Sequence, residues 1–408
     1  MKILIMKKLY SAIFILAVFC AQSFSQNVWT KKANFGAGMR AWATGIAIGA
    51  KGYIGLGAYP LSTRWNDFWE WDPATNVWSQ KANFPGAVRD NATGFSIGNK
   101  GYLGLGGIYS GGPFYSDLYE YDPSNNSWTQ KSNFPGGARQ LAAGFSIGTK
   151  GYIETGRGSS GLKNDLWEWN QATDTWVQKA NFGGTAREGT VAFSIGTKGY
   201  VGIGDNMSIN YNDFWEWDQA TDTWTQKANL TGAARSYGVG FSIAGKGYIG
   251  TGANSSSYLN DFWEWDPMTN AWTACANYGG PLTSSGTGFS IGVKGYIGLG
   301  GSSASVTHSD FWEYSPLNNS ANEISNERFS VISFPNPFTD FTTVKINSDV
   351  YFNNAQLILF DVAGKKIKNV EFSGKQIVIQ RDKLQSGVYF YQISSGNKTL
   401  ASGKIVVE

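Results

Sequence analysis

Four polar residues near the middle of the chain have the side-chain types that acid–base chemistry uses. They are Glu154, Arg157, Glu188 and Asp205. Carboxylates can donate and accept protons when their surroundings adjust their pKa values. A pocket that brings Glu154, Arg157 and Asp205 together would therefore favour an enzyme. Two other interpretations of Glu154 stay open: it lines the mouth of a channel, or it only pairs with Arg157.

Metal and histidine chemistry has few residues to draw on. The chain has one histidine, His308, which excludes a two-histidine metal site and any site that needs a second histidine. We expect His308 to be a solvated loop residue. Of the two cysteines, only Cys275 remains once a predicted leader is removed, so no internal disulfide is expected. The sequence predicts no catalytic set, no metal ion and no cofactor.

Aromatic residues outside the regular strand positions form a second candidate site. Of 17 tryptophans, only Trp42 and Trp65 fall outside positions that recur along the chain. Exposed aromatic side chains tend to mark recognition surfaces. The alternative, which stays open, is that these side chains plug loops against the strands below them. The candidate ligand-binding residues are Trp42, Tyr59, Trp65, Tyr109, Tyr115, Tyr237 and Tyr258.

The regular positions belong to an internal repeat. A tryptophan recurs every 48 to 50 residues, at Trp29, Trp78, Trp128, Trp176, Trp224 and Trp272. An acidic-aromatic box, "DFWEWD" in its first copy at residues 67–72, recurs six times. A glycine-rich block such as "ATGFSIGNKGYLGLGG", from residue 92, lies between boxes. Each unit is predicted to contain four short strands joined by tight turns.

The box strand carries recurring residues on both of its faces. With a period of two residues, Trp69 and Trp71 point to one face, and Phe68 and Glu70 to the other. A sheet covered by similar sheets on both sides is typical of a propeller blade. Residues 28–35 have the pattern of a fourth strand, and none follows the sixth box. The predicted fold is all-β, a six-bladed β-propeller closed by the N-terminal outer strand.

The glutamates of the box recur in equivalent places, which argues against a catalytic role. We expect them to bond between blades or to pair with the arginines that open the units, because buried charges need partners. The glutamates are Glu70, Glu120, Glu168, Glu216, Glu264 and Glu313, and the arginines are Arg40, Arg89, Arg139, Arg187 and Arg235. The connections that vary between units all fall on one face, called the loop face below.

These motifs resemble the kelch repeat over residues 28–316. The family pattern has a strand that ends in two glycines, then an aromatic residue before a tryptophan, with an arginine opening the next unit. In the second unit these roles fall on Gly106, Gly107, Tyr121 and Trp128. The second glycine is replaced in four units, by Ala58, Arg157, Asp205 and Ala253, and the sixth unit has Thr283 where the arginine is expected.

A different pattern begins at residue 328, after a polar linker at residues 317–327. It contains "FPNP", "LFDVAGK", "GVYFYQI" and a terminal "GKIVV", in alternating strands of a small Ig-like β-sandwich. In this order the motifs resemble the C-terminal sorting domain of type IX secretion. The resemblance implies export across the outer membrane of a Gram-negative bacterium. The expected domains are thus a propeller at residues 26–316 and a sorting domain at residues 328–408.

The N-terminus has the pattern of a signal peptide over residues 1–25. Three lysines precede an apolar run that is too short to span a bilayer, and small residues stand before the expected cleavage site. The formal net charge of +3 indicates no preference for nucleic acid or membranes. The mature chain is expected to be a monomer with no transmembrane span.

The sequence thus predicts a secreted or cell-surface binding protein, exported by Sec and type IX secretion, whose propeller recognises a glycan or a protein through the loop face. Its expected partners are the secretion machinery, through residues 328–408, and that extracellular ligand. The alternative is a kelch-type carbohydrate-active enzyme, a sugar mutarotase or a lyase, that uses arginine, tyrosine and glutamate. A structural role in a surface layer is a third possibility.

Overall fold

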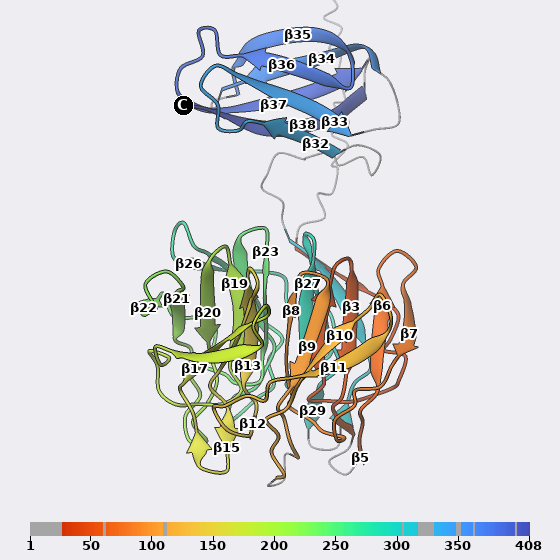
Figure 1. The fold of residues 1–408 in the computed structure, drawn as a ribbon, viewed down its shortest axis with the longest axis vertical. Helices are drawn as coiled ribbons and strands as arrows, with labels where there is room; N and C mark the ends of the chain where they lie inside the picture. The colour runs from red at the N-terminus through yellow and green to blue at the C-terminus, as the bar shows by residue number, and fades with distance from the viewer. Residues whose placement is uncertain are drawn as a thin grey trace, which may run out of the picture. The chain divides into compact units, whose positions relative to one another are not determined.

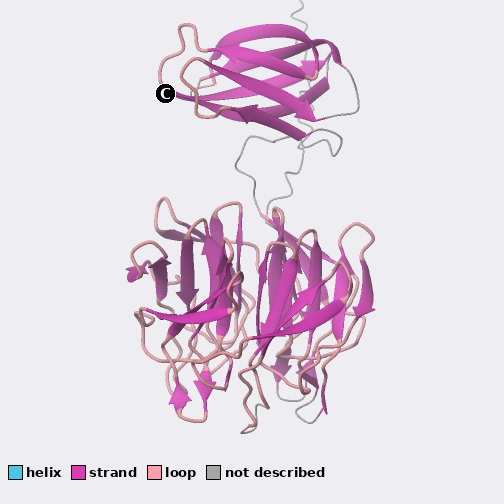
Figure 2. Cartoon of the chain, in the orientation of Figure 1, coloured by secondary structure: helices cyan, strands magenta, loops and turns pink. Residues whose placement is uncertain are grey.

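The computed structural model describes residues 27–59, 63–108, 112–303, 306–316, 330–347, 352–361, 364–395 and 398–408. The chain divides into two compact units between Pro316 and Leu317. All the regular secondary structure in the described residues is β-strand, and Figure 2 shows no helix among them. The all-β fold is confirmed, and each unit is described separately below.

The first unit contains six four-stranded antiparallel sheets within the described residues, which are the blades of a propeller (Figure 1). Blade one contains β2 (Thr44–Ile48), β3 (Lys51–Gly55), β6 (Phe68–Asp72) and β7 (Val77–Lys81). Blade two contains β8 (Thr93–Ile97), β9 (Lys100–Gly104), β10 (Leu118–Asp122) and β11 (Ser127–Lys131). Blade three contains β13 (Ala143–Ile147), β14 (Lys150–Glu154), β17 (Leu166–Asn170) and β18 (Thr175–Lys179). Blade four contains β19 (Val191–Ile195), β20 (Lys198–Gly202), β21 (Phe214–Asp218) and β22 (Thr223–Lys227). Blade five contains β23 (Val239–Ile243), β24 (Lys246–Gly250), β25 (Phe262–Asp266) and β26 (Ala271–Ala274). Blade six contains β27 (Thr287–Ile291), β28 (Lys294–Gly298), β31 (Phe311–Ser315) and β1 (Val28–Lys31). The first strand of each blade lines a central channel.

Short strands on the loop face extend the loops between the second and third strands of several blades, and in blade three they also pair with the connection that enters the blade. They are β4 (Ala58–Tyr59) with β5 (Thr63–Arg64), β12 (Arg139–Gln140) with β15 (Arg157–Gly158) and β16 (Gly161–Leu162), and β29 (Gly301–Ser303) with β30 (Val306–Thr307). These extensions differ from blade to blade, whereas the blades themselves repeat. The loop face is therefore the variable face of the unit.

The N-terminal strand closes the propeller. β1 pairs with β31 in antiparallel register, and Trp29 lies opposite Tyr314. The indole ring of Trp29 packs at 4.9–5.1 Å, between ring centroids, from Phe262 of blade five, Tyr278 and Tyr314. The first and last blade segments of the unit are thus held in one sheet. This confirms the closure predicted from the sequence.

Aromatic rings from neighbouring blades interlock between the sheets. Phe68 of blade one lies 5.0 Å, between ring centroids, from both Tyr121 and Trp128 of blade two. The sheets can approach this closely because small residues face the rings. A Cβ atom added at Gly52 would collide with the ring of Phe289 in blade six. The recurring glycine before the tyrosine of the second strand is therefore a packing requirement.

A buried ion pair holds the loop face of each of blades one to five. In blade one the guanidinium of Arg40, which is fully buried, donates to both carboxylate oxygens of Asp67 at 2.6 and 2.9 Å. It also donates to the carbonyl oxygen of Leu56 at 2.8 Å. The equivalent pairs are Arg89 with Asp117, Arg139 with Asp165, Arg187 with Asp213, and Arg235 with Asp261. These bidentate pairs clamp the connection between blades to the strand beneath it.

Blade six keeps the geometry of this clamp without the arginine. The hydroxyl of Thr283 donates to the carbonyl oxygen of Leu299 at 3.2 Å, which replaces one arginine bond. The aspartate of this blade, Asp310, accepts instead from the hydroxyl of Tyr278 at 3.1 Å. Tyr278 stands where the other blades have phenylalanine or leucine. Two neutral hydroxyl donors thus replace the arginine in blade six.

The box glutamates do not pair with these arginines, so that expectation is wrong. In blade one Glu70 accepts from the hydroxyl of Tyr53 at 2.6 Å and lies within 3.4 Å of Lys51 and Lys81. All four residues belong to the same blade. Burial alone would raise the pKa of Glu70, but the bonds from Tyr53 and the two lysines together lower it. These bonds of Glu70 stay within blade one rather than crossing between blades, and Arg40 is bound instead by Asp67, the first aspartate of the box.

The second unit is a two-sheet sandwich with its own core. One sheet contains β32 (Ser330–Phe334), β33 (Phe341–Asn347) and β36 (Gln376–Gln380), and the other contains β34 (Phe352–Phe360), β35 (Lys366–Gly374), β37 (Gly387–Ser395) and β38 (Lys398–Val407). Leu357, Ile393 and Ile405 are almost completely buried between the sheets. The expected small sandwich is therefore present after the propeller.

We predict that removing residues 28–35 lowers the melting temperature of the propeller sharply. The deletion exposes the edge of β31 and removes the ring of Trp29 from its pocket. Trp29 is half-buried, so its loss alone should cost less than the roughly 3–5 kcal/mol typical of a fully buried aromatic side chain. Thermal melts of the deletion, of Trp29→Ala and of a chain that begins at Asn27 measure the effect. The last variant keeps the strand and should melt like the parent; equal melting of all three would contradict the closure.

Candidate functional site

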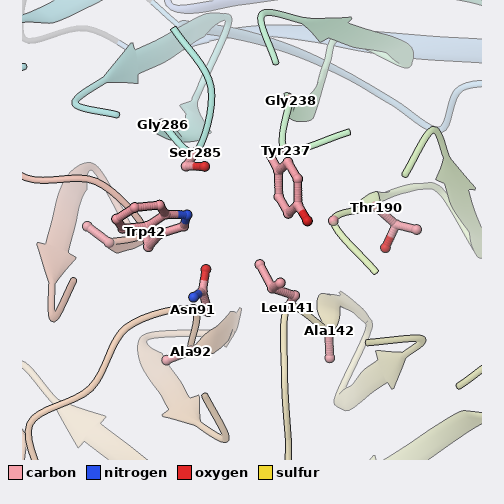
Figure 3. A pocket seen from close by; sticks show the side chains of 12 residues that line it. Trp42, Asn91, Ala92, Leu141, Ala142, Thr190, Tyr237, Gly238, Ser285 and Gly286 are labelled. Carbon is pink, nitrogen blue, oxygen red and sulfur yellow. The ribbon is translucent and has the colours of Figure 1, made fainter. Parts of the chain in front are cut away.

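Six residues, one from each blade, form a closed ring around the channel at the loop face. Each lies two positions after the arginine position, or after Thr283 in blade six. They are Trp42, Asn91, Leu141, Gly189, Tyr237 and Ser285, and they are called the channel ring below. The backbone N–H of each donates to the carbonyl oxygen of its neighbour, at N–O distances of 2.9 to 3.3 Å. Figure 3 shows the labelled side chains of five members around one opening.

The ring forces an uncommon backbone conformation. All six residues have φ between 55° and 64°, in the left-handed region, although only Gly189 lacks a side chain. Holding a residue with a side chain there costs on the order of 1–3 kcal/mol. Blade four carries glycine at this position, whereas Trp42, Leu141 and Tyr237 are bulky. These bulky side chains therefore sit in a conformation that glycine would adopt at lower cost, as do buried scaffold residues such as Leu56 and Ile203.

Two ring aromatics lie beside an apolar cavity of about 280 Å³. Trp42, Tyr237 and Tyr258 line it together with small residues of blades one, five and six, namely Ala41, Ala253, Ser284, Ser285, Gly301, Ser303 and Thr307. Because the other lining residues are small, they leave a cavity that the three aromatic rings border. Three of the predicted ligand-binding aromatics thus converge on one cavity.

A second cavity of about 350 Å³ lies on the other side of Tyr237. Arg157, Glu188 and Asp205 line it. The Nε atom of Arg157 lies 2.9 Å from Glu188 Oε2, and the hydroxyl of Tyr237 donates to Glu188 Oε1 at 3.1 Å. Burial raises the pKa of Glu188, which the positive charge of Arg157 partly offsets. Of the predicted polar set, these three residues converge.

Glu154 lies apart from this polar cavity. Its side chain is fully buried, and Oε1 accepts from the hydroxyl of Thr190 at 2.9 Å. Thr190 itself lines the channel. Burial raises the pKa of Glu154 to about 8, so at neutral pH the carboxyl is mostly protonated. Arg157 pairs with Glu188 rather than with Glu154. Glu154 is a buried acid behind the channel-lining Thr190, and it lines none of the cavities described here.

Two predicted loop aromatics cover buried arginines. The guanidinium carbon of Arg40 lies 4.3 Å from the ring centroid of Trp65, and that of Arg89 lies 4.0 Å from Tyr115. One ring face of each is therefore occupied by the protein itself. Tyr59 lies in the short strand β4 and lines none of the cavities described here. Tyr109 lies outside the described residues.

The sequence interpretation missed several residues of the loop face. Met207 and Ile209, which are 64% and 59% exposed, line the polar cavity. Gln140 and Asp90 are fully buried directly after their arginines, and Asp90 pairs with Arg64 at 2.7 Å. In the sequence, the residue that follows each arginine could have indicated Asp90 and Gln140. It varies between blades as much as the channel ring does.

The remaining reactive side chains offer little chemistry. His308 is half-buried with Nε2 enclosed, so it is less solvated than expected. Burial raises the pKa of the Cys275 thiol to about 11, which keeps it protonated. Among the residues that the structure describes, no three His, Cys, Asp or Glu side chains gather as metal ligands would. The same residues include no helix with the length and hydropathy needed to cross a membrane.

Comparison with known proteins assigns the second unit and supports the fold of the first. Residues 333–408 match the family model of the secretion system C-terminal sorting domain. No curated protein matches the chain significantly. Among many matching solved structures, the one titled "Structure of YjhT" has 17% sequence identity and a TM-score of 0.62, and the match covers 71% of this chain and 98% of that one. The sorting domain supports export by type IX secretion, to the medium or to the outer surface of the cell.

Glu154→Gln is predicted to stabilise the protein increasingly as the pH rises. The pKa of Glu154 is about 8 in the folded chain and near 4.5 when unfolded. Folding therefore retains a proton in this window, and the stability that Glu154 contributes falls as pH rises from 4.5 to 8. The full difference is roughly 5 kcal/mol. Thermal melts at about pH 5 and about pH 9 should show a small and a large gain, respectively.

Two control variants accompany this measurement. Glu154→Gly installs the residue found at Gly55 and Gly250, and it should remove the same pH dependence. Glu216→Gln should instead destabilise, because Lys198 and Tyr200 help to lower the pKa of Glu216 although burial would raise it. An equal gain from Glu154→Gln at both pH values would contradict the buried-acid interpretation.

Proposed function

We propose that the protein binds an extracellular glycan or protein at the centre of its loop face. The observation that carries this proposal is the convergence of Trp42, Tyr237 and Tyr258 on the apolar cavity. Two of these residues sit in a strained conformation in which glycine would be easier to hold. Aromatic side chains fixed by a rigid ring can stack on a ligand with little loss of entropy.

The candidate binding residues divide into two groups on this proposal. Trp42, Tyr237 and Tyr258 contact the ligand directly. Tyr59, Trp65 and Tyr115 form the outer wall of the loop face, with Trp65 and Tyr115 presenting only the ring face that Arg40 and Arg89 leave open. This division explains how the same aromatic composition can serve both loop packing and recognition.

An enzyme remains the second candidate, and the polar cavity favours it. Arg157, Glu188 and Asp205 lie together there with the hydroxyl of Tyr237. A carboxyl whose pKa is raised by burial is suited to proton transfer. A sugar mutarotase or a lyase built on this cavity would lose turnover in Glu188→Gln while still binding its substrate.

Export is the part of the function that the second unit performs. We propose that a Sec signal peptide at residues 1–25 delivers the chain to the periplasm of a Gram-negative bacterium, and that the sorting domain then directs it outward. The propeller and the sandwich have separate cores, so they can fold as separate units. The propeller would meet its ligand outside the cell.

Trp42→Gly and Tyr237→Gly are predicted to weaken ligand binding several-fold. Trp42→Gly should change the melting temperature little, whereas Tyr237→Gly should also lower it, because it removes the hydroxyl that donates to the buried Glu188. Each loses an aromatic contact worth about 0.5–1.5 kcal/mol beyond buried area. Each also relieves the left-handed strain, as Gly189 does in blade four. A ligand is first identified by screening glycan arrays and by retaining surface proteins on the immobilised chain. Titration of that ligand then compares the binding affinity of the variants with that of the parent.

Trp217→Ala is the matched control for these substitutions. Trp217 is fully buried between blades, so its loss should cost about 3–5 kcal/mol whatever it does to binding. Early melting of Trp42→Gly and Tyr237→Gly with ligand retention intact would mean that these side chains are loop plugs.

Deleting residues 328–408 is predicted to leave a folded propeller inside the cell envelope. The sandwich carries the sorting signal, while the propeller does not need it to complete any blade. Cell fractionation and circular dichroism measure location and folding. The full chain and a chain with the linker shortened by a few residues serve as controls. Normal amounts of the truncated chain in the medium would refute the sorting role.

A further inference from the structure

The polar cavity contains a buried carboxylate oxygen that lacks a donor. Asp205 is only 8% exposed, and its Oδ1 accepts from the backbone N–H of Met207 at 2.8 Å. Its Oδ2 has no hydrogen-bond partner among the described residues, although the side chain lines the cavity. A buried, unsatisfied carboxylate oxygen is costly. Four other blades avoid this cost, because they carry Ala58, Gly107, Ala253 and Gly301 at the equivalent position.

The charges around Asp205 leave one negative charge uncompensated. Arg157 is the positively charged residue of the cavity, and it pairs with Glu188. The hydroxyl of Tyr237 occupies the other oxygen of Glu188. The remaining lining residues, Met207, Ser208, Ile209, Asn210 and Ser255, are uncharged. The cavity therefore favours a cation that can donate a hydrogen bond to Asp205 Oδ2.

The rim of the same cavity is aliphatic. Met207 and Ile209 stand in one loop of blade four, directly beyond Asp205, and both are largely exposed. Exposed apolar residues beside a buried acid suit a ligand with a hydrocarbon stem and a charged end. An amino sugar carries hydroxyl groups around its amine, and these would be poorly matched to the Met207 and Ile209 side chains.

We propose that this cavity binds a lysine side chain of an extracellular protein. The ammonium group donates to Asp205 Oδ2, and the methylene stem lies on Met207 and Ile209. The inference rests on the proposed binding function and specifies its ligand as a protein. Tyr237 borders both cavities, so the partner's residues next to the lysine would reach the apolar cavity beside Trp42.

The test compares two small probes that differ in charge. Nα-acetyl-lysine amide should bind to the full chain and perturb the NMR signals of Met207 and Ile209 methyl groups. Nα-acetyl-norleucine amide, which has the same stem without the amine, should bind at least about tenfold more weakly, as expected for loss of a charge-assisted hydrogen bond. Glucosamine is a third probe, which tests whether the cavity binds the amine of an amino sugar instead of a lysine. Binding of glucosamine without binding of the lysine probe would overturn the proposal.

Three variants complete the experiment. Asp205→Asn keeps the side-chain shape, and Asp205→Ala installs the residue of blades one and five; both should weaken the lysine probe about tenfold or more and leave the norleucine probe unchanged. Asp222→Asn makes the same charge change on the opposite face, where Asn270 holds the equivalent place, and should have no effect. Equal affinity of both probes, or unchanged affinity in both Asp205 variants, would overturn the lysine site. Ligand retention that depends on Trp42 would survive that result, so the proposed binding function is tested separately.

Discussion

The closed circle of backbone hydrogen bonds in the channel ring is the constraint on which the loop face depends. Each N–H in the ring is satisfied by the neighbouring blade, so every blade must present a left-handed residue at the same height. A circle of this kind has no ends, and it can form only when the last blade meets the first. The pairing of β1 with β31 joins the first and last segments of the unit, and it therefore supports the position of ring side chains such as Trp42.

The buried arginine–aspartate pairs hold the backbone of the loop face, so that neighbouring side chains can differ between blades. In five blades a buried bidentate ion pair ties the connection between blades to the box strand, and blade six reaches the same geometry with Thr283 and Tyr278. With the backbone held in this way, the residue after the arginine, the ring residue and the second residue of the glycine pair are free to vary. All the charged residues of the polar cavity, Arg157, Glu188 and Asp205, occupy such positions.

The fold could be predicted from the sequence because the same strand and turn motifs recur in six units. The spacing of Trp29 and Trp78, the box and the missing final strand were enough to derive the blades and their closure. The site could be predicted only in part, since a single sequence does not show which way a side chain turns. Trp65 and Trp42 looked equivalent, yet one covers Arg40 and the other borders a cavity. Glu154 lies three residues from Arg157 in the sequence, but Arg157 pairs with Glu188 of the next blade.

A nearly symmetric scaffold thus supports an asymmetric face. Blades two to four bury charged or amide side chains, including Asp90, Gln140, Glu154, Glu188 and Asp205. Blades five, six and one place small residues around the apolar cavity, with the rings of Trp42, Tyr237 and Tyr258 beside them. Tyr237 belongs to both halves, because its ring borders the apolar cavity and its hydroxyl bonds to Glu188. A ligand that fills both cavities must therefore be apolar on one side of Tyr237 and polar on the other, which fixes its orientation as well as its position.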